Sequence, residues 1–163
     1  MSHWEALGRS DEWYTPAYIF KALGETFDMD VAGPLIPCHV PTPVTLCANS
    51  LRQEWEGFVW MNPPYGGRNS LLPWLDKFFA HGCGVALVPD RTSAPWFQEA
   101  FPKSDLALFV PKIKFERPDG SLGKSPSNGS VLMAAGHTAC RALRRAGASG
   151  LGILAKPIAR KSA

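Results

Sequence analysis

A short apolar run that ends in two prolines constrains this chain more than any other stretch. Residues 57–61, Gly-Phe-Val-Trp-Met, are followed by Asn62, Pro63, Pro64 and Tyr65 and then by two glycines. An apolar run of this length, closed by prolines and glycines, is typical of a buried parallel strand that ends in a turn. Each proline fixes its own φ and lacks an N–H, and Pro63 also disfavours helix at Asn62. We therefore expect Asn62 and Tyr65 to be held rigidly at a strand end.

This turn suits methyl transfer to a planar and weakly nucleophilic NH2 group. The Asn62 side-chain oxygen and the Pro63 carbonyl can accept the two N–H bonds, which draws electron density onto the nitrogen and aims its lone pair. Tyr65 can stack on the ring that carries the amine. The chemistry requires no metal, and the predicted catalytic residues are Asn62, Pro63, Pro64 and Tyr65.

Several stretches in a fixed order extend this pattern along the chain. They are residues 11–16 (Asp-Glu-Trp-Tyr-Thr-Pro), 27–32, 51–55 running into 60–65, 88–92 followed by Trp96-Phe97, and 112–115 with 125–130. Together, over roughly residues 10 to 135, they resemble the phage and prophage DNA N6-adenine methyltransferase (Dam-like) family. The resemblance implies S-adenosylmethionine as cofactor, S-adenosylhomocysteine as product, and double-stranded DNA as partner. It also implies site-specific methylation of adenine by base flipping, a phage or prophage gene, and a role in restriction-modification or regulation.

Two other classes of function remain open from the residues alone. The Asn-Pro-Pro-Tyr tetrapeptide also occurs in enzymes that methylate glutamine or guanine, so a protein or RNA methyltransferase is one alternative. A non-catalytic nucleic-acid-binding relative is the other, because the part of the chain that would bind the cofactor is short. Cofactor binding separates the second alternative from an enzyme.

The resemblance implies an α/β fold, a class I Rossmann-like methyltransferase with a mostly parallel sheet and helices on both faces. About 26 residues separate Val31 from Phe58, where a full-length enzyme has two further strand and helix units, and four prolines in residues 34–49 exclude a helix there. We therefore expect a trimmed sheet. The length suits one domain, 1–163, with a cofactor and catalytic part (1–100) and a basic part (101–163) that carries DNA-facing strands and a C-terminal helix.

The first predicted helix covers residues 15 to 24. Thr15 can cap it, Pro16 suits its first position and Gly24 can end it. The resemblance places this segment against the cofactor, which makes Trp13, Tyr14, Thr15 and Pro16 candidate cofactor contacts. For Thr15 the two interpretations, helix cap and cofactor contact, have equal weight.

Two acidic residues lie in the first predicted strand, residues 27–31. Asp28 and Asp30 share one face, and a carboxylate at the end of such a strand can accept hydrogen bonds from cofactor hydroxyls. We favour Asp30, which is nearer the loop, and the alternative for both is a solvent-facing edge. No Gly-x-Gly follows Asp30, whereas Ser50 and Leu51 fall where the family contacts the cofactor adenine.

Further strands are expected at residues 85–88, 105–110 and, as the last one, 130–135, and residues 151–155 close the chain. Helices are expected after Ser70, which can cap the first of them, around Trp96 and Phe97 as core residues, and around Arg141, Arg144 and Arg145. The exit of the 85–88 strand places Asp90, Arg91 and Thr92 on the same rim as Asn62, because open α/β sheets bind ligands beyond the carboxyl ends of their strands.

Charge is distributed unevenly along the chain. Residues 1–100 hold six Lys and Arg against eleven Asp and Glu, and residues 101–163 hold eleven against three. This balance predicts a phosphate-facing surface in the last third, with a solvated basic tail as the alternative. The predicted substrate-binding residues are Tyr65, Arg91, Lys112, Lys114, Phe115, Arg117 and Lys124.

Phe115 has two possible roles. The resemblance implies that it packs on the flipped base opposite Tyr65, and the alternative is an antiparallel hairpin with Phe115 in the core. Sequence specificity is expected in the loops at 66–70 and 116–128.

Membrane and secretory functions are not expected. The sequence contains no apolar run that approaches the ~20 residues of a membrane span. Its first residues have neither a basic start nor an apolar segment, so we expect a cytoplasmic protein. The four cysteines lack a C-x-x-C pair, and a zinc site at Cys38, His39 and Cys47, or at His81 and Cys83, would lack the usual closely spaced ligand pairs.

Overall fold

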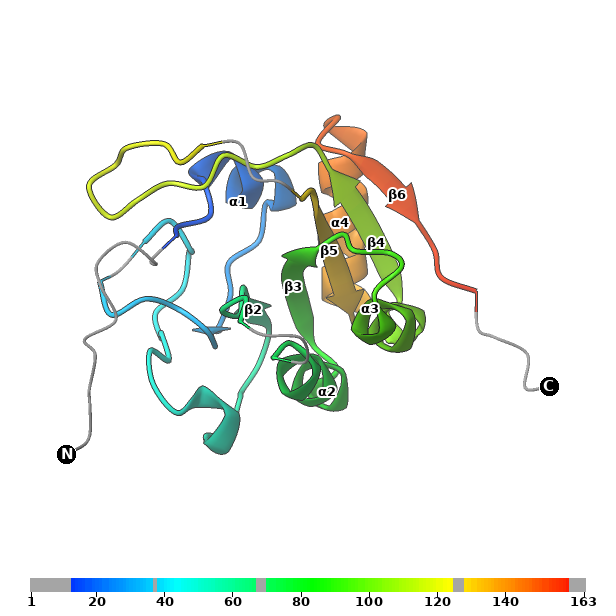
Figure 1. The fold of residues 1–163 in the computed structure, drawn as a ribbon, viewed down its shortest axis with the longest axis horizontal. Helices are drawn as coiled ribbons and strands as arrows, with labels where there is room; N and C mark the ends of the chain where they lie inside the picture. The colour runs from blue at the N-terminus through cyan, green and yellow to red at the C-terminus, as the bar shows by residue number, and fades with distance from the viewer. Residues whose placement is uncertain (1–12, 37, 67–69, 125–127, 159–163) are drawn as a thin grey trace.

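A six-stranded sheet in the order β1-β2-β3-β5-β4-β6 forms the centre of the computed structural model (Figure 1). The structure describes residues 13–36, 38–66, 70–124 and 128–158. The helices are α1 (Ala17–Leu23), α2 (Leu72–His81), α3 (Pro95–Ala100) and α4 (His137–Ala148), with 3-10 turns η1 (Ser50–Arg52) and η2 (Phe101–Lys103). The strands are β1 (Met29–Asp30), β2 (Val59–Met61), β3 (Gly84–Pro89), β4 (Leu106–Val110), β5 (Ser130–Ala135) and β6 (Ile153–Ala155). Within the described ranges, none of the helices has the length and apolar character to cross a membrane.

The sheet is mixed, so the expectation of a mostly parallel sheet is wrong. Strands β1, β2 and β3 are parallel neighbours, whereas β5 pairs antiparallel with both β3 and β4, and β6 pairs antiparallel with β4. Parallel neighbours require a long crossover, usually a helix. The described part of the connection from β4 to β5 is instead a hairpin, so β5 returns antiparallel beside β4.

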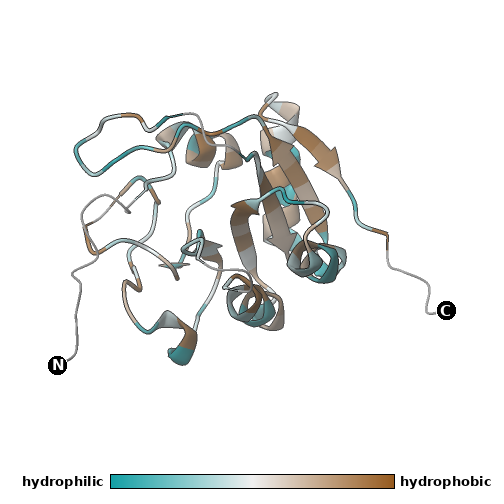
Figure 2. Cartoon of the chain, viewed as in Figure 1, coloured by the Kyte–Doolittle hydropathy of each residue, from teal (hydrophilic) through white to brown (hydrophobic). Residues whose placement is uncertain are grey.

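Helices cover both faces of the sheet, as the sequence predicts (Figure 1). Alternate strand residues face opposite sides, so Trp60, Leu87 and Leu132 pack with α1 and α4. Their neighbours Met61, Val88 and Met133 pack with α2 and α3. Strands β3, β4 and β5 are hydrophobic along their length (Figure 2), as expected for strands buried on both faces.

The proline-rich segment after β1 forms an irregular edge of the sheet. Phe27 N donates to Pro41 O at 2.9 Å, and Asp30 N donates to Val44 O at 2.8 Å. Leu46 N in turn donates to Asp30 O at 2.8 Å. This segment contains no helix, as predicted, and η1 is the only helical turn between β1 and β2 in the described ranges.

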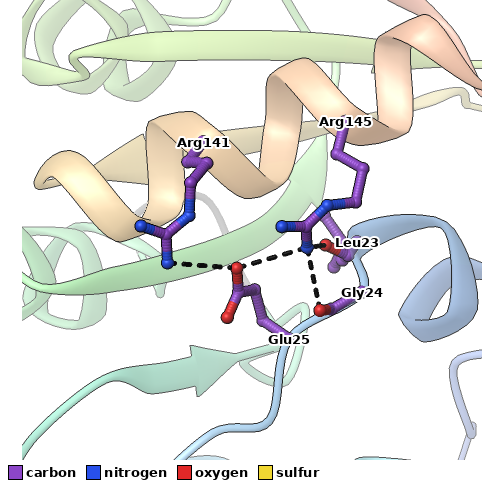
Figure 3. Close-up of polar contacts among 5 residues, drawn as sticks. All are labelled: Leu23, Gly24, Glu25, Arg141 and Arg145. Carbon is purple, nitrogen blue, oxygen red and sulfur yellow. Dashed lines mark hydrogen bonds and ion pairs between the residues drawn. The ribbon is translucent and has the colours of Figure 1, made fainter.

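Helix α1 is fixed at its C-terminal end by arginines from α4 (Figure 3). Arg145 Nη1 donates to Leu23 O and Gly24 O, both at 2.8 Å, and lies 3.2 Å from Glu25 Oε1. Arg141 Nη2 lies 3.3 Å from the same carboxylate oxygen. Because a helix leaves its last carbonyls without intrahelical partners, Arg145 caps α1. Two arginines of the basic C-terminal third therefore have a structural role.

Candidate active site

Asn62 lies at the carboxyl end of β2, where the neighbouring strand is longer. Strand β2 ends at Met61, which pairs with Ala86, whereas β3 continues to Pro89. The β3 backbone from Leu87 onward therefore has no partner in β2, and the turn after Met61 lies beside it. The carboxyl ends of the strands are the usual place for a ligand in an open α/β sheet.

The side chains of Thr15, Asn62 and Tyr65 form a hydrogen-bonded chain at the carboxyl end of β2. Asn62 Nδ2 donates to Thr15 Oγ1 at 3.2 Å. The Tyr65 hydroxyl reaches both Asn62 Oδ1, at 3.1 Å, and Leu87 O, at 3.3 Å. The amide of Asn62 is thus contacted at both ends, by residues from two distant parts of the chain.

Tyr65 has an inward hydroxyl and an outward ring. The residue is 47% exposed, although its hydroxyl points toward Leu87 O. Burial of the hydroxyl raises the pKa of Tyr65, so the group stays neutral and remains a hydrogen-bond donor. Pro63 is buried and Pro64 is exposed, so the turn is packed on one side and open on the other.

Thr15 does not cap a helix, and this interpretation is wrong. The N-cap of α1 is Pro16, with φ −61° and ψ 147°, and no side chain caps the helix. The Thr15 side chain is only 3% exposed and its hydroxyl faces Asn62 instead. The position of α1 allows this contact because Phe20 packs on Trp60, with ring centroids 4.7 Å apart.

Asp30 is a buried carboxylate on the same side of the sheet. It pairs in register with Trp60, and Asn62 follows two residues later, so all three share the α1 face. Asp30 is 2% exposed, and this burial raises its pKa from 3.8 to about 6, although Ala32 N donates to Oδ1 at 3.2 Å. A Cβ at Gly33 would lie 2.6 Å from Asp30 Oδ2, so the loop after β1 passes directly over this carboxyl group.

Asp28 belongs to the opposite end of the strands. Its Oδ2 accepts a hydrogen bond from Phe58 N at 2.7 Å, where the chain enters β2. Gly57 precedes with φ 66°, and a Cβ there would lie 2.2 Å from the same oxygen. The structure therefore does not bring Asp28 to Asn62, whereas it does bring Asp30 to the carboxyl edge.

The turn that carries Ser50 and Leu51 is fixed by two side chains that the sequence analysis missed. Trp55 Nε1 donates to Ser50 O at 3.1 Å and to Ser50 Oγ at 3.0 Å. Lys77 Nζ donates to Ser50 O at 3.3 Å, to Leu51 O at 3.0 Å and to Gln53 O, and lies 4.9 Å from the Trp55 ring centroid. A single lysine in an amphipathic helix gives no sequence signal for this role.

A pocket of about 370 Å³ opens beside Tyr65, on the α2 and α3 side of the sheet. Arg91 lies in its wall as predicted, and Trp96, a predicted core residue, is buried and also contributes to the wall. Ser70 does not cap α2, because its Oγ accepts from Gly66 N at 3.0 Å and the N-cap is Leu71. The full lining comprises Tyr65, Gly66, Ser70, Leu71, Pro89, Arg91, Trp96 and Asn128. Gly66, Ser70 and Asn128 belong to the two predicted specificity loops, whereas no sequence signal indicated Leu71 and Pro89 as pocket residues.

The segment after β4 is an antiparallel hairpin, which agrees with the backbone part of that alternative. Gly123 N donates to Phe115 O and Arg117 N donates to Ser121 O, both at 2.8 Å. The hairpin also pairs with the N-terminal segment: Tyr14 N donates to Glu116 O at 2.7 Å, and Glu116 N donates to Tyr14 O at 2.9 Å. Phe115 is half-buried and packs against the core formed with α1 and α4.

The predicted phosphate-binding side chains project from the surface of this region. Lys112, Lys114 and Lys124 are exposed, and the Arg117 guanidinium lies 5.3 Å from the Trp13 ring centroid. Trp13 in turn packs where a Cβ of Gly123 would be. Residues 67–69 and 125–127 of the two predicted specificity loops lie outside the described residues.

Comparison with known proteins agrees with these features. The family model described as DNA N-6-adenine-methyltransferase (Dam) matches residues 5–136, which include the hydrogen-bonded chain, Asp30 and the hairpin. No curated protein and no solved structure matches the chain. The family match covers well over half of the 163 residues and stops at the start of α4. The chain therefore belongs to the DNA N-6-adenine-methyltransferase (Dam) family.

Proposed function

We propose that the protein transfers a methyl group from S-adenosylmethionine to the N6 amine of adenine at specific sites in double-stranded DNA. The observation that carries this proposal is the Asn62 carboxamide, held between Thr15 and Tyr65 at the carboxyl end of β2. The family match supports the substrate, because the family is named for DNA adenine methylation. The fold we propose is a trimmed class I Rossmann-like methyltransferase fold.

The cofactor site in this proposal lies on the α1 side of Asn62. Its residues are Trp13, Tyr14, Thr15 and Pro16 before α1, Asp30 after β1, and Ser50 and Leu51 of η1, with Asn62 at the boundary to the substrate. A buried carboxylate such as Asp30, whose pKa is raised to about 6, is stabilised by hydrogen-bond donors such as cofactor hydroxyls. The bound cofactor supplies an electrophilic methyl group on a sulfonium. Asp28 is not part of the proposed site.

The protein prepares the amine for attack through its acceptors. An amide oxygen has two lone pairs, so Asn62 Oδ1 can keep its contact with the Tyr65 hydroxyl and still accept one N–H of the adenine amine. The Pro63 carbonyl is the proposed acceptor for the other N–H. With the cofactor bound, the nitrogen lone pair would form the new N–C bond while the bond between the methyl carbon and sulfur breaks, which leaves the neutral thioether S-adenosylhomocysteine, and the amine would lose one proton to solvent. Alignment of the reacting groups supplies most of the rate enhancement.

Adenine in duplex DNA must leave the base stack to reach this site. We propose that the flipped base enters the pocket beside Tyr65, whose half-exposed ring offers a stacking surface. Arg91 in the pocket wall and the exposed cations Lys112, Lys114, Arg117 and Lys124 would contact phosphates, which positions the duplex without reading its sequence.

The test is incorporation of labelled methyl groups from S-adenosylmethionine into unmethylated double-stranded DNA, followed by nucleoside analysis. We expect N6-methyladenine from the wild-type protein and at least a hundredfold less from Asn62→Ala, roughly the loss expected when a reacting group is no longer aligned. The variant should bind the cofactor and unfold at the wild-type temperature. Methyl groups found in protein or RNA instead of DNA would contradict the substrate, and absence of cofactor binding would favour a non-catalytic relative.

A further inference from the structure

The Asn62 carboxamide has two chemically different ends, so its orientation matters as much as its position. Oδ1 accepts hydrogen bonds and Nδ2 donates them. In the reaction proposed above, on which this inference rests, only Oδ1 can accept an N–H of the adenine amine. A carboxamide turned over would present N–H donors to another donor and could not bind the amine.

The hydrogen bond at one end of this amide must change when the base binds, whereas the hydrogen bond at the other end can stay in place. At Oδ1 the partner is Tyr65, at 3.1 Å, on the side where the base must enter. The incoming amine competes for lone pairs of this oxygen, so the contacts at this end change during the reaction. At Nδ2 the partner is Thr15 Oγ1, at 3.2 Å, on the α1 side. Thr15 is the partner that can stay in place throughout.

Thr15 is itself held rigidly from both directions. On its N-terminal side, Tyr14 exchanges two backbone hydrogen bonds with Glu116, at 2.7 and 2.9 Å. On its C-terminal side, Pro16 has the fixed φ of proline and leads directly into α1, which packs on β2 through Phe20. The Thr15 hydroxyl is not used as a helix cap, and the side chain is 3% exposed. A buried hydroxyl in a fixed backbone is therefore directed at Asn62.

We propose that Thr15 is a positioning residue that fixes the orientation of the Asn62 carboxamide, with Oδ1 toward the substrate amine. Thr15 accepts the hydrogen bond from Nδ2, and this contact keeps the donor end of the amide away from the place where the base binds. Thr15 thus acts on the chemical step through Asn62.

The first test compares Thr15→Val, which keeps the shape and removes the acceptor, with Thr15→Ser, which keeps the hydroxyl. We expect kcat to fall roughly 10- to 100-fold in Thr15→Val, as for a slightly misplaced catalytic group. Because Thr15 is also a residue of the proposed cofactor site, kcat is measured at saturating cofactor, and its fall should exceed any rise in the cofactor Kd. Thr15→Ser should stay within a few-fold of wild type. A raised cofactor Kd with unchanged kcat would overturn the proposal, because Thr15 would then act on the cofactor. Thr15→Ala replaces Thr15→Val if the valine variant does not fold.

A second test, in the Asn62→Asp background, separates an effect of Thr15 on the orientation of the residue 62 side chain from an effect on packing. In Asn62→Asp the two carboxylate oxygens are equivalent, so turning the group over changes nothing. Thr15→Val should therefore lower kcat much less in the Asn62→Asp background than in the wild type. An equal loss in both backgrounds would overturn the proposal, since it would show that Thr15 acts by packing alone.

A third readout does not depend on methyl transfer. In isotope-labelled protein, the Asn62 side-chain NH2 signals should exchange slowly with solvent in the wild type and in Thr15→Ser, and quickly in Thr15→Val. The same exchange rate in all three would overturn the inference. Protected signals in a wild-type protein that methylates no DNA would overturn the proposed function and leave the role of Thr15 at the amide supported.

Discussion

Polar side chains have different surroundings at the two edges of the sheet that run across the strands, one where the parallel strands begin and the other at their carboxyl ends. At the edge where the parallel strands begin, acidic side chains have hydrogen-bond donors: Asp28 accepts from Phe58 N, and Asp105 accepts from Gly136 N at 2.8 Å. Glu25, just before β1, lies within 3.3 Å of the guanidinium groups of two arginines of α4. At the carboxyl edge, Asp30 is buried with a raised pKa, and within the described residues Lys114 and Lys124 take part in no ion pair. We therefore expect polar groups at the first edge to stabilise the fold and those at the second to contribute to ligand binding.

This difference explains why charge counts along the sequence mislead. Arg141 and Arg145 contribute to the basic last third of the chain, yet they bind Glu25 and the end of α1. The cations of the hairpin contribute equally to the count, and in the proposed function they contact DNA. We therefore expect the location of a cation in the fold, rather than net charge, to distinguish structural from ligand-binding cations.

The largest effect is expected for Asp30→Asn, which tests the role assigned to the carboxyl edge. We expect the cofactor Kd to rise roughly 10- to 100-fold, because a charge-assisted hydrogen bond contributes about 1.5 to 3 kcal/mol. The same change should stabilise the protein at pH 8, since it removes a buried carboxylate whose pKa is raised from 3.8 to about 6, equivalent to roughly 3 kcal/mol. Calorimetric cofactor titration and denaturant unfolding measure the two effects. Asp28→Asn is the matched control and should leave the cofactor Kd unchanged.

The pH dependence of Asp30 has a defined sign. Because its pKa is about 6 when folded and 3.8 as the reference value, the folded state holds the proton more tightly between these two values. The Asp30 contribution to the free energy of unfolding therefore falls by roughly 3 kcal/mol as pH rises through this window and is constant above it. Subtracting the free energy of unfolding of Asp30→Asn from that of the wild type at each pH separates the Asp30 contribution from the contributions of the other carboxyl groups. Cofactor affinity should move the other way and weaken below pH 6, whereas a flat profile would remove Asp30 from the site.

At the opposite edge the expected effects are on stability alone. Asp28→Ala removes the acceptor of Phe58 N and should lower the free energy of unfolding by about 1 to 3 kcal/mol. Asp28→Asn keeps an acceptor oxygen and should lose less. Urea unfolding gives both values, and the cofactor Kd should be the same in both variants. A change in cofactor affinity would show that the two edges are not separate in function.

The smallest predicted effect concerns salt. Lys114→Ala and Lys124→Ala should each reduce the slope of log K against log salt for DNA binding by about 1, because each removes one phosphate contact. Arg141→Ala should leave this slope unchanged, since Arg141 is paired with Glu25. Fluorescence anisotropy over a salt series measures the slopes. Equal slopes for all three variants would contradict the division between structural and ligand-binding cations.

The parts of the molecule that follow from local sequence were predicted well. Strand β5 has its expected bounds, and the described residues of the proline-rich segment after β1 form no helix. The Asn-Pro-Pro-Tyr turn lies at a strand end because proline geometry dictates it locally. Trp96 and Phe97 are core residues, since apolar periodicity is itself a local signal.

The parts that depend on contacts between distant residues were not predictable. The expectation of a mostly parallel sheet was wrong because the antiparallel pairing of β5 between β3 and β4 is decided by packing of the whole sheet. Thr15 can satisfy the pattern of a helix cap, and only the placement of α1 over β2 directs its hydroxyl to Asn62. Asp28 and Asp30 share a face in sequence, yet Gly57 and Gly33 give them different surroundings.

The pairing of Tyr14 with Glu116 has a mechanical consequence. Residue 14 immediately precedes Thr15, and residue 116 lies in the hairpin that bears the exposed cations. A displacement of the hairpin would therefore be transmitted through two backbone hydrogen bonds to Tyr14 and so to Thr15, which contacts the Asn62 amide. In the proposed function, the hairpin whose cations would contact the duplex is therefore linked through Tyr14 and Thr15 to the Asn62 amide that would bind the base, so a movement of one would be transmitted to the other.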